Sequence, residues 1–238
     1  MEKKTIMLTR KIQLLIDCDD TEKRRVYYQQ LFDWQRLCFR GGNYLFSHQF
    51  IQDQIKEIVY ITDDIKVKLA DINKDPDGIL NTSRMNTTYR LLSAYFKGEM
   101  PSDIFSNLNN TLIRIYNSER SSYWKGEKSL RSYKRNIPIP FSASQIKLMG
   151  DDKGRDYKFN LFKIPFRTYL GKDRSDKKVL LQRTMMGTLK LCNSSLKIEK
   201  GKLFLLACFE MEKESHCLNE STIAEASLSI EYPDHPKD

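Results

Sequence analysis

The chain has few of the residue types that build metal clusters or cross-linked scaffolds. Its 238 residues include five cysteines, none of which forms a Cys-x-x-Cys pair: Cys18, Cys38, Cys192, Cys208 and Cys217. An odd and scattered set of this kind argues against a zinc ribbon or a disulfide framework, and it predicts a reduced, cytoplasmic protein. His48 lies among apolar residues, and His216 beside Cys217 has no further ligand nearby in the sequence. Neither histidine therefore indicates a metal site or a nucleophilic triad.

Long apolar runs are also absent. Residues 6–16 are mostly apolar, but Arg10 and Lys11 interrupt them and no cleavage motif follows. No other segment reaches the ~18 apolar residues that a membrane-spanning helix needs. The chain contains neither a Walker loop nor a G-x-G-x-x-G motif. We therefore expect no membrane attachment, no metal and no small-molecule cofactor.

Positive charge is abundant and unevenly distributed. The formal net charge is +9, and a chain this basic favours polyanions as partners. Residues 153–190 hold much of the excess, with Asp156, Asp173 and Asp176 opposing a larger basic set: Lys153, Arg155, Lys158, Lys163, Arg167, Lys172, Arg174, Lys177, Lys178, Arg183 and Lys190. Tyr and Phe are interleaved with these cations. Such a segment is typical of proteins that hold a phosphate backbone.

The first half of the chain is predicted to be one strand followed by helices. Residues 5–15 alternate as a strand does, and Asp20 is a suitable N-cap for a helix that follows. Gly41-Gly42 is expected to break or kink that helix. Apolar residues at three- and four-residue steps predict further helices at 44–69, 82–96 and 102–116.

After Trp124 the apolar period changes to two. This pattern predicts strands at 137–141, 144–148, 157–165, 178–182, 188–198 and 202–211, and Lys200-Gly201 predicts a hairpin turn. The simplest architecture lets the first strand join the later ones. We therefore expect an α+β fold in which a small antiparallel β-barrel, like an oligonucleotide-binding barrel, is split by an inserted helical bundle.

The order of these segments resembles a known family. One strand is followed by a helical block, then by Ser132-Tyr133-Lys134-Arg135-Asn136-Ile137-Pro138, and then by basic strands. This order resembles the N-terminal half of miniature type V CRISPR effectors and their TnpB relatives. Residues 187–190 and 202–205 resemble the paired strands that precede the RuvC nuclease of that family. The resemblance implies four parts: a first strand of the wedge barrel (1–17), a helical recognition lobe (18–128), the rest of the wedge barrel (129–214) and a degenerate start of the RuvC segment or tail (215–238).

The chain departs from the family at the nuclease. The family's first RuvC strand carries a metal-binding Asp, whereas the matching segment Glu225-Ala226-Ser227-Leu228-Ser229-Ile230 has Ser227 at that position. A neutral hydroxyl cannot replace a carboxylate that holds Mg²⁺. No second or third catalytic carboxylate and no cysteine-rich ribbon follows before Asp238. We therefore expect no catalytic residue and no metal-dependent cleavage.

The basic segments supply the candidate nucleic-acid-binding residues: Lys125, Lys128, Arg131, Tyr133, Lys134, Arg135, Lys158, Lys163, Arg167, Lys172, Arg174, Lys177, Lys178 and Arg183. Tyr133 is expected to stack on a sugar or base; the alternative for residues 131–135 is a solvated linker between two lobes. Residues 172–178 are expected in a hairpin loop, with a loose surface cluster as the alternative.

Other patterns have simpler explanations. Tyr116, Tyr123 and Trp124, near a helix end, are expected to pack in the core instead of stacking on bases. Residues 73–78 partly match a calcium loop, but the twelfth position counted from Asn73 is Arg84, so we predict a turn. The acidic residues at 17, 19 and 20 are explained by helix capping.

These expectations give one leading function and three alternatives. The leading hypothesis is a protein that binds a guide RNA and, through it, a DNA target without cutting. The alternatives are a generic RNA- or single-strand-binding module, a fragment of a larger type V effector and a purely structural interaction protein without nucleic-acid affinity. The resemblance further implies a homodimer on one guide, for which Tyr44, Phe46 and Phe50 are candidate contacts.

Overall fold

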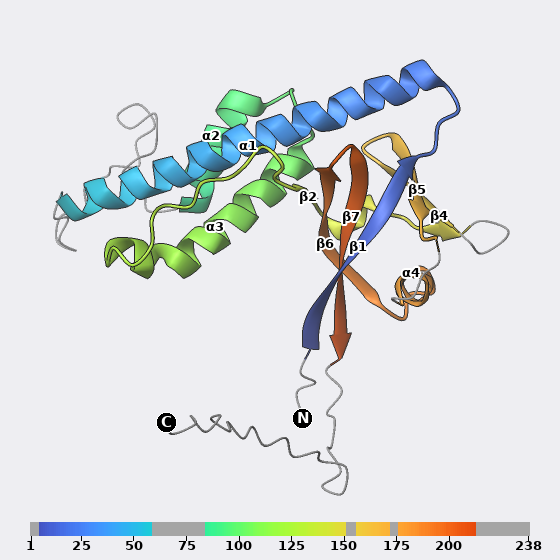
Figure 1. Ribbon diagram of the computed structural model, residues 1–238. Coiled ribbons are helices and arrows are strands. Elements are labelled where there is room, and N and C mark those ends of the chain that lie inside the picture. Colours follow the sequence, from blue (N-terminus) through green and yellow to red (C-terminus); the bar gives the residue numbers. More distant parts are fainter. Residues whose placement is uncertain (1–4, 59–83, 151–155, 172–175, 213–238) are drawn as a thin grey trace, which may run out of the picture.

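The computed structural model describes residues 5–58, 84–150, 156–171 and 176–212. Along the chain it contains β1 (Thr5–Ile16), α1 (Thr21–Ile58), α2 (Arg84–Phe96), α3 (Ser102–Trp124), β2 (Ile139–Phe141), the 3₁₀ turn η1 (Ala143–Gln145), β3 (Met149–Gly150), β4 (Tyr157–Leu161), β5 (Ile164–Tyr169), α4 (Lys177–Met185), β6 (Lys190–Glu199) and β7 (Lys202–Glu212). The fold is therefore α+β. Helices α1, α2 and α3 lie together at one side of the strands, and α4 lies apart from them (Figure 1).

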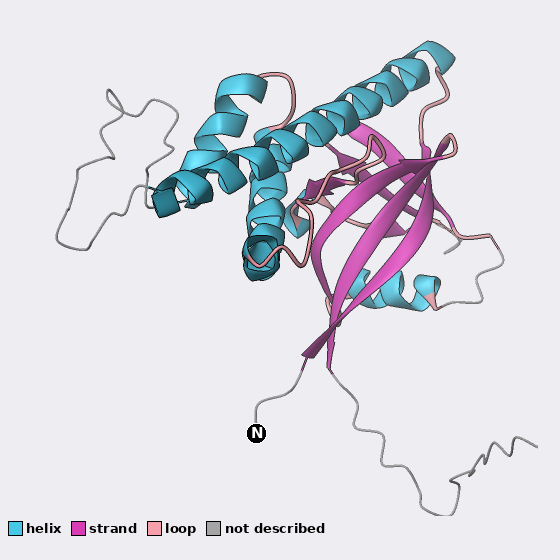
Figure 2. Ribbon diagram, turned by 60° about the vertical axis from the view of Figure 1, so that its left-hand side comes forward, coloured by secondary structure: helices cyan, strands magenta, loops and turns pink. Residues whose placement is uncertain are grey.

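The strands form one antiparallel sheet in the order β2-β6-β7-β1-β5-β4-β3. Strand β1 is central: it pairs with β7 from Thr5↔Glu212 to Leu14↔Leu203 and with β5 from Gln13↔Tyr169 to Ile16↔Phe166. The prediction that the first strand joins the later ones is confirmed. The sheet is strongly curled (Figure 2). In the described ranges, however, its edge strands β2 and β3 are not paired with each other, so it is a half-barrel and not a closed barrel.

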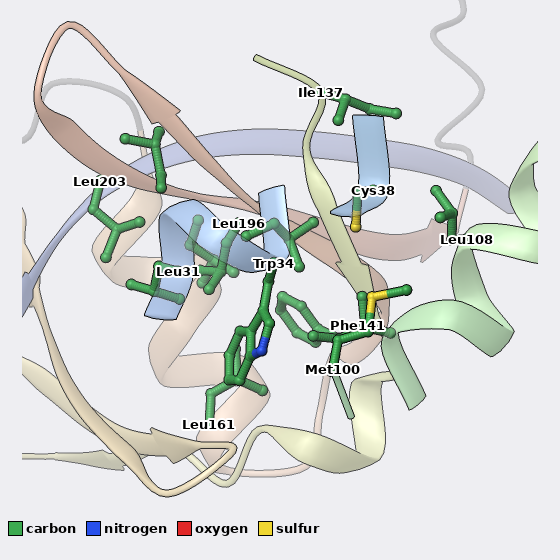
Figure 3. Close-up of a cluster of buried hydrophobic side chains, with 14 of the residues drawn as sticks. Leu31, Trp34, Cys38, Met100, Leu108, Ile137, Phe141, Leu161, Leu196 and Leu203 are labelled. Carbon is green, nitrogen blue, oxygen red and sulfur yellow. The ribbon is translucent and has the colours of Figure 1, made fainter. Parts of the chain in front are cut away.

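The inner face of the half-barrel holds the core. Alternate residues of β1 and β7 are buried there, and α1 contributes Leu31, Trp34, Leu37 and Cys38. Figure 3 shows Leu31, Trp34 and Cys38 among side chains of the sheet, which include Leu161, Leu196 and Phe141. Leu180 and Leu181 of α4 are also buried in this core. One apolar core therefore joins the helices to the sheet.

Helix α1 begins as expected but is longer than predicted. The Asp20 carboxylate accepts hydrogen bonds from the backbone N–H groups of Glu22 (2.9 Å) and Lys23 (3.1 Å), which confirms the N-cap. These bonds lower the pKa of Asp20. None of the helices in the described ranges is long and apolar enough to cross a membrane.

The prediction was that Gly41-Gly42 breaks or kinks the helix; the break is wrong, because α1 continues through these residues. A Cβ atom on Gly41 would lie 3.1 Å from Leu92 and 3.2 Å from Phe96, and one on Gly42 would lie 3.3 Å from the Tyr133 ring. The glycines therefore permit close packing of α2 and of the segment around Tyr133, and they do not end the helix. Helix α3 likewise extends beyond the predicted end at Tyr116, to Trp124.

Two strand predictions are also wrong, at 178–182 and 144–148, and a third is right only in part. Residues 178–182 lie in α4, where the N–H of Leu180 donates to the carbonyl of Asp176 (3.0 Å); adjacent Leu180 and Leu181 are both buried, which an alternating strand does not allow. Residues 157–165 form a hairpin of β4 and β5, turning at Phe162 (φ 51°) and Lys163 (φ 67°). Residues 144–148 form part of η1 and a loop. In contrast, β6, β7 and the turn at Lys200-Gly201 are confirmed.

Candidate nucleic-acid interface

The segment that follows α3 is held along the helices by its backbone. The Asn43 side chain accepts a hydrogen bond from the N–H of Tyr133 (2.8 Å) and donates to its carbonyl (3.1 Å), while Gln35 donates to the carbonyl of Ile137 (3.2 Å). The Tyr133 ring lies edge-to-face against Phe46, with ring centres 5.2 Å apart. Desolvation raises the pKa of Tyr133. The structure therefore places this ring against α1, in a packing position and not on an open surface.

Glu119 of α3 binds the start of the same segment. Its carboxylate accepts hydrogen bonds from the Tyr123 hydroxyl (2.5 Å), Arg131 Nε (3.1 Å), an Arg131 terminal nitrogen and Lys128 Nζ (3.4 Å). The Arg131 bond is the main reason why the pKa of Glu119 falls to about 2. Lys125 pairs with Glu127 at 3.8 Å. Arg131 and Lys128 thus fasten the segment to α3, and part of their charge is neutralised there.

Lys134 and Arg135 are arranged differently. Both side chains are exposed at a turn in which the N–H of Ile137 donates to the carbonyl of Lys134 (3.1 Å). Among the residues that the structure describes, neither is within ion-pair distance of a carboxylate. These are the cations of residues 125–135 that are best placed to meet a phosphate.

A second basic group lies on the face of the sheet opposite the core. Lys158 on β4 and Arg167 on β5 are direct cross-strand partners, and both are exposed. The Asp17 carboxylate pairs with both, at 2.9 Å from Lys158 Nζ and 3.7 Å from Arg167 Nε. Asp17 carries a single negative charge, so it does not neutralise both cations by itself. Exposed ion pairs of this kind add little stability, so Lys158 and Arg167 can exchange the Asp17 carboxylate for a phosphate.

The same face carries aromatic residues that the sequence analysis did not select. Strand pairing places Lys197, Phe204, Gln13 and Tyr169 in one row across β6, β7, β1 and β5. Lys11 Nζ lies 4.1 Å from the centre of the Phe204 ring and 2.7 Å from a carboxylate oxygen of Glu199. Tyr169 is 55% exposed. We refer to Lys11, Gln13, Lys158, Arg167, Tyr169, Lys197 and Phe204 as the outer-face cluster.

The outer-face cluster combines cations with aromatic rings at short spacing. Adjacent strands lie roughly 4.8 Å apart, and alternate residues of one strand lie roughly 7 Å apart on the same face. Arg167 and Tyr169 are therefore neighbours on β5, and Lys158 is beside Arg167. Cations that hold phosphates next to rings that stack on bases are the arrangement by which single-stranded nucleic acid is bound.

The remaining predicted residues lie elsewhere. Lys177 and Lys178 are on α4 and not in a hairpin loop, which corrects that prediction, and Arg183 is on the same helix. The carbonyl of Lys178 accepts a bond from the Tyr157 hydroxyl (3.3 Å). Since Tyr157 and Lys158 point to opposite faces of β4, α4 is on the core side of the sheet, away from the outer-face cluster.

Lys163 is exposed in the turn between β4 and β5, beside α1: the neighbouring Phe162 ring lies edge-to-face against Trp34 with ring centres 5.6 Å apart. Lys172, Arg174, Ser227 and the predicted turn at 73–78 lie outside the described residues. The predicted packing of Tyr116 and Tyr123 is confirmed, since both are buried. The structure thus brings Lys158 and Arg167 together, and it does not unite all the predicted residues on one surface.

The described residues contain no cluster of three or more His, Cys, Asp or Glu side chains arranged to hold a metal ion. Asp17 and Asp20 have other partners: Asp17 pairs with Lys158 and Arg167, and Asp20 caps α1.

Comparisons with known proteins give one structural similarity. No protein-family model matches the chain, and no curated protein matches it. One similar solved chain comes from a cryo-EM structure of a Cas12f1–sgRNA–target DNA complex, with a TM-score of 0.49 and 11% sequence identity. The match covers 91% of this chain but spans only 61% of the other. A similarity of this size does not establish a shared function.

Proposed function

We propose that this chain binds nucleic acid through the outer-face cluster, with Lys134 and Arg135 as additional phosphate contacts. The observation that carries the proposal is the cross-strand row of Lys197, Phe204, Gln13 and Tyr169 beside the paired cations Lys158 and Arg167. Lysine and arginine supply sequence-independent attraction to phosphates, and exposed rings accept any base. The net charge of +9 supports the same partner class.

The ligand that we propose is a structured guide RNA, which in turn pairs with target DNA. The support is the order of a strand, helices, the segment 132–138 and basic strands, together with its resemblance to miniature type V effectors. The test is to express the chain with its genomic neighbourhood, purify it and sequence the RNA that co-purifies. A discrete RNA species is expected; only a mixture that mirrors the total cellular RNA would count against a guide.

A generic single-strand binder is the second candidate, and the outer-face cluster favours it specifically, because stacking on Phe204 and Tyr169 does not depend on sequence. Competition in increasing salt separates the two. A generic binder holds unrelated RNAs within roughly tenfold of one another at every salt concentration. A guide-binding protein retains its scaffold RNA at salt concentrations where other RNAs have dissociated.

Removing the paired cations is expected to weaken binding and flatten its salt dependence. In the variant Lys158→Ala/Arg167→Ala, the log–log salt slope should fall by up to about 1.4, because each phosphate contact with a single strand contributes about 0.7. Tyr169→Ala should instead lower affinity by roughly tenfold and leave the slope unchanged, because stacking releases no counterions. Fluorescence anisotropy with single-stranded RNA over a salt series measures both quantities.

The matched control is Lys23→Ala/Arg36→Ala on α1. It removes the same charge from side chains that are 70% and 69% exposed and form local ion pairs with Asp20 and Asp33. Its affinity and slope should remain close to those of the unaltered chain. If the control and the outer-face variant lose binding equally, the effect comes from net charge and the outer-face cluster is not the interface.

We further propose that binding occurs without cleavage. The purified chain, incubated with Mg²⁺ and single- or double-stranded DNA or RNA, is expected to leave the substrate intact on denaturing gels. Ser227→Asp should not change this result, because one added carboxylate does not assemble a two-metal site. Mg²⁺-dependent cutting that a point change in this chain abolishes would contradict the proposal.

A further inference from the structure

Two cysteines face each other on neighbouring strands. Cys192 on β6 and Cys208 on β7 are direct cross-strand partners, and both are half-buried free thiols. The preceding pair in the same register, Lys190↔Glu210, points to the same face of the sheet and forms an ion pair at 2.6 Å. The two thiols therefore project from the outer face, away from the core, beside this ion pair.

The distance between such partners suits a disulfide. Opposite residues in an antiparallel pair have Cα atoms about 4.5 to 5.5 Å apart, within the roughly 4.4 to 6.8 Å that disulfides span. Their Cβ atoms are about 4.5 to 5.5 Å apart, so they must approach by up to about 1 Å or slightly more to reach disulfide geometry.

A β-bulge next to the pair allows this adjustment. The register shifts between Cys192 and Ser195. The Ser194 hydroxyl donates to the carbonyl of Cys192 (2.8 Å) and accepts from the N–H of Cys208 (3.2 Å). A bulge locally interrupts the ladder of backbone hydrogen bonds and bends the strand. The backbone on the β6 side of the pair is therefore less constrained than in a regular ladder.

The surroundings of Cys192 affect its reactivity. Partial burial, then Cys208 and Glu210, raise the pKa of Cys192, while Lys190 opposes them. Because the thiolate is the reactive form, the raised pKa slows the reaction of Cys192 near neutral pH. Once one of the two thiols has reacted, the other is held opposite at a high effective concentration.

We propose that Cys192 and Cys208 are a dithiol modification site that a low-molecular-weight disulfide oxidises to a cross-strand disulfide. The thiolate of one cysteine attacks a sulfur of the reagent, which forms a mixed disulfide and releases one reagent thiol. The second cysteine thiolate then attacks the protein sulfur and releases the second reagent thiol. Overall, two protein thiols lose two electrons and two protons, and one reagent disulfide becomes two thiols.

The resulting bond would connect β6 and β7 across the bulge. Because the Cβ atoms must move together to form it, the disulfide is expected to be strained and readily reduced. The site would then respond to the thiol–disulfide balance around the protein. This inference does not depend on nucleic-acid binding.

The test uses the full chain, fully reduced and then incubated with oxidised glutathione. Intact mass and peptide mapping after alkylation are expected to show a linked Cys192–Cys208 peptide pair and no lasting glutathione adduct at either residue. In Cys192→Ser, the second step is impossible, so a glutathione adduct should accumulate on Cys208. Millimolar dithiothreitol should restore both thiols in the unaltered chain.

Two control variants test specificity. Cys18→Ser and Cys217→Ser should leave the Cys192–Cys208 link unchanged, which excludes reshuffling through these two cysteines. Stable glutathione adducts on Cys192 or Cys208 of the unaltered chain would overturn the proposal. So would oxidation confined to other cysteines. These readouts need no comparison of stability, so a destabilised variant does not obscure the result.

Discussion

Trp34→Ala is expected to destabilise the fold by about 3 to 5 kcal/mol, the range for removing a large buried aromatic residue. Trp34 is 4% exposed and lies where α1 meets the sheet (Figure 3). Its ring contacts Phe162 edge-to-face, in the turn between β4 and β5. Removing the ring therefore weakens the contact between α1 and the sheet. It also leaves a cavity, because the surrounding side chains belong to several elements and cannot collapse together to fill it.

Denaturant unfolding followed by fluorescence and far-ultraviolet circular dichroism measures this effect. Phe32→Ala is the matched control, since it removes an aromatic ring from the same helix at a position that is 46% exposed. The control should cost less than about 1 kcal/mol. If the two variants are equally stable, Trp34 does not join α1 to the sheet. If Trp34→Ala unfolds the sheet but not the helices, the two parts are less cooperative than a single core implies.

The pairing of β1 with the later strands could be predicted because local pattern and global topology agree there. Residues 5–15 alternate in polarity, and the half-burial of a sheet requires this alternation. An isolated first strand also has to pair with distant partners, and only the later segments offered strands. The hairpin at Lys200-Gly201 was predictable for a local reason, since glycine there adopts φ 73°.

The errors have equally physical causes. Phe162 and Lys163 turn β4 into β5 with positive φ angles, although neither residue type normally marks such a turn. In α4 the core on the inner face of the sheet accommodates two adjacent leucines, and a helix satisfies this burial better than a strand. The glycine pair Gly41-Gly42 suggested a helix break, but it permits close packing instead. The packing partners, Leu92 and Tyr133, lie about 50 and 90 positions further along the chain, so a local pattern does not reveal them.

The candidate interface was predictable only in part. Lys158 and Arg167 were selected because their charge is visible in the sequence. Phe204 and Tyr169 were not, because their position beside these cations depends on the pairing of β7 with β1 and of β1 with β5. The alternation in 202–211 separates inward from outward residues, and it could have identified Phe204 as an outward aromatic residue. Cross-strand register, by contrast, cannot be obtained from the composition of one strand.

Tyr133 shows the opposite error. Its position between Arg131 and Lys134 suggested a ring that faces a nucleic acid, yet Asn43 binds its backbone and Phe46 packs against its ring. The basic residues beside it point elsewhere: Arg131 binds Glu119, while Lys134 and Arg135 are exposed. A basic segment thus serves two purposes, fastening the chain to the helices and presenting cations to solvent.

Arg120→Ala is expected to destabilise the helices by up to about 3 kcal/mol, because it removes a cation that contacts a carboxylate inside the protein. Asp53 of α1 has no exposed side-chain surface, and its Oδ2 accepts hydrogen bonds from Arg120 Nε and from the Tyr116 hydroxyl, each at 2.8 Å. Arg120 itself is 45% exposed, so its charge is partly screened by water. The expected loss is therefore at the low end of the range for a broken buried pair.

The reverse truncation should cost less. Asp53→Ala removes the buried charge and leaves the cation, and a half-exposed guanidinium can be hydrated, so the expected loss is about 1 to 3 kcal/mol from the missing hydrogen bonds. Arg114→Ala is the matched control, because Arg114 is exposed on α3, the helix that carries Arg120. Its free energy of unfolding should stay within about 0.5 kcal/mol of that of the unaltered chain. Urea unfolding of the three variants at one pH gives the order. A smaller loss for Arg120→Ala than for Asp53→Ala would mean that Asp53 is held by its hydrogen bonds to neutral groups, and that the ion pair contributes little to the packing of α1 against α3.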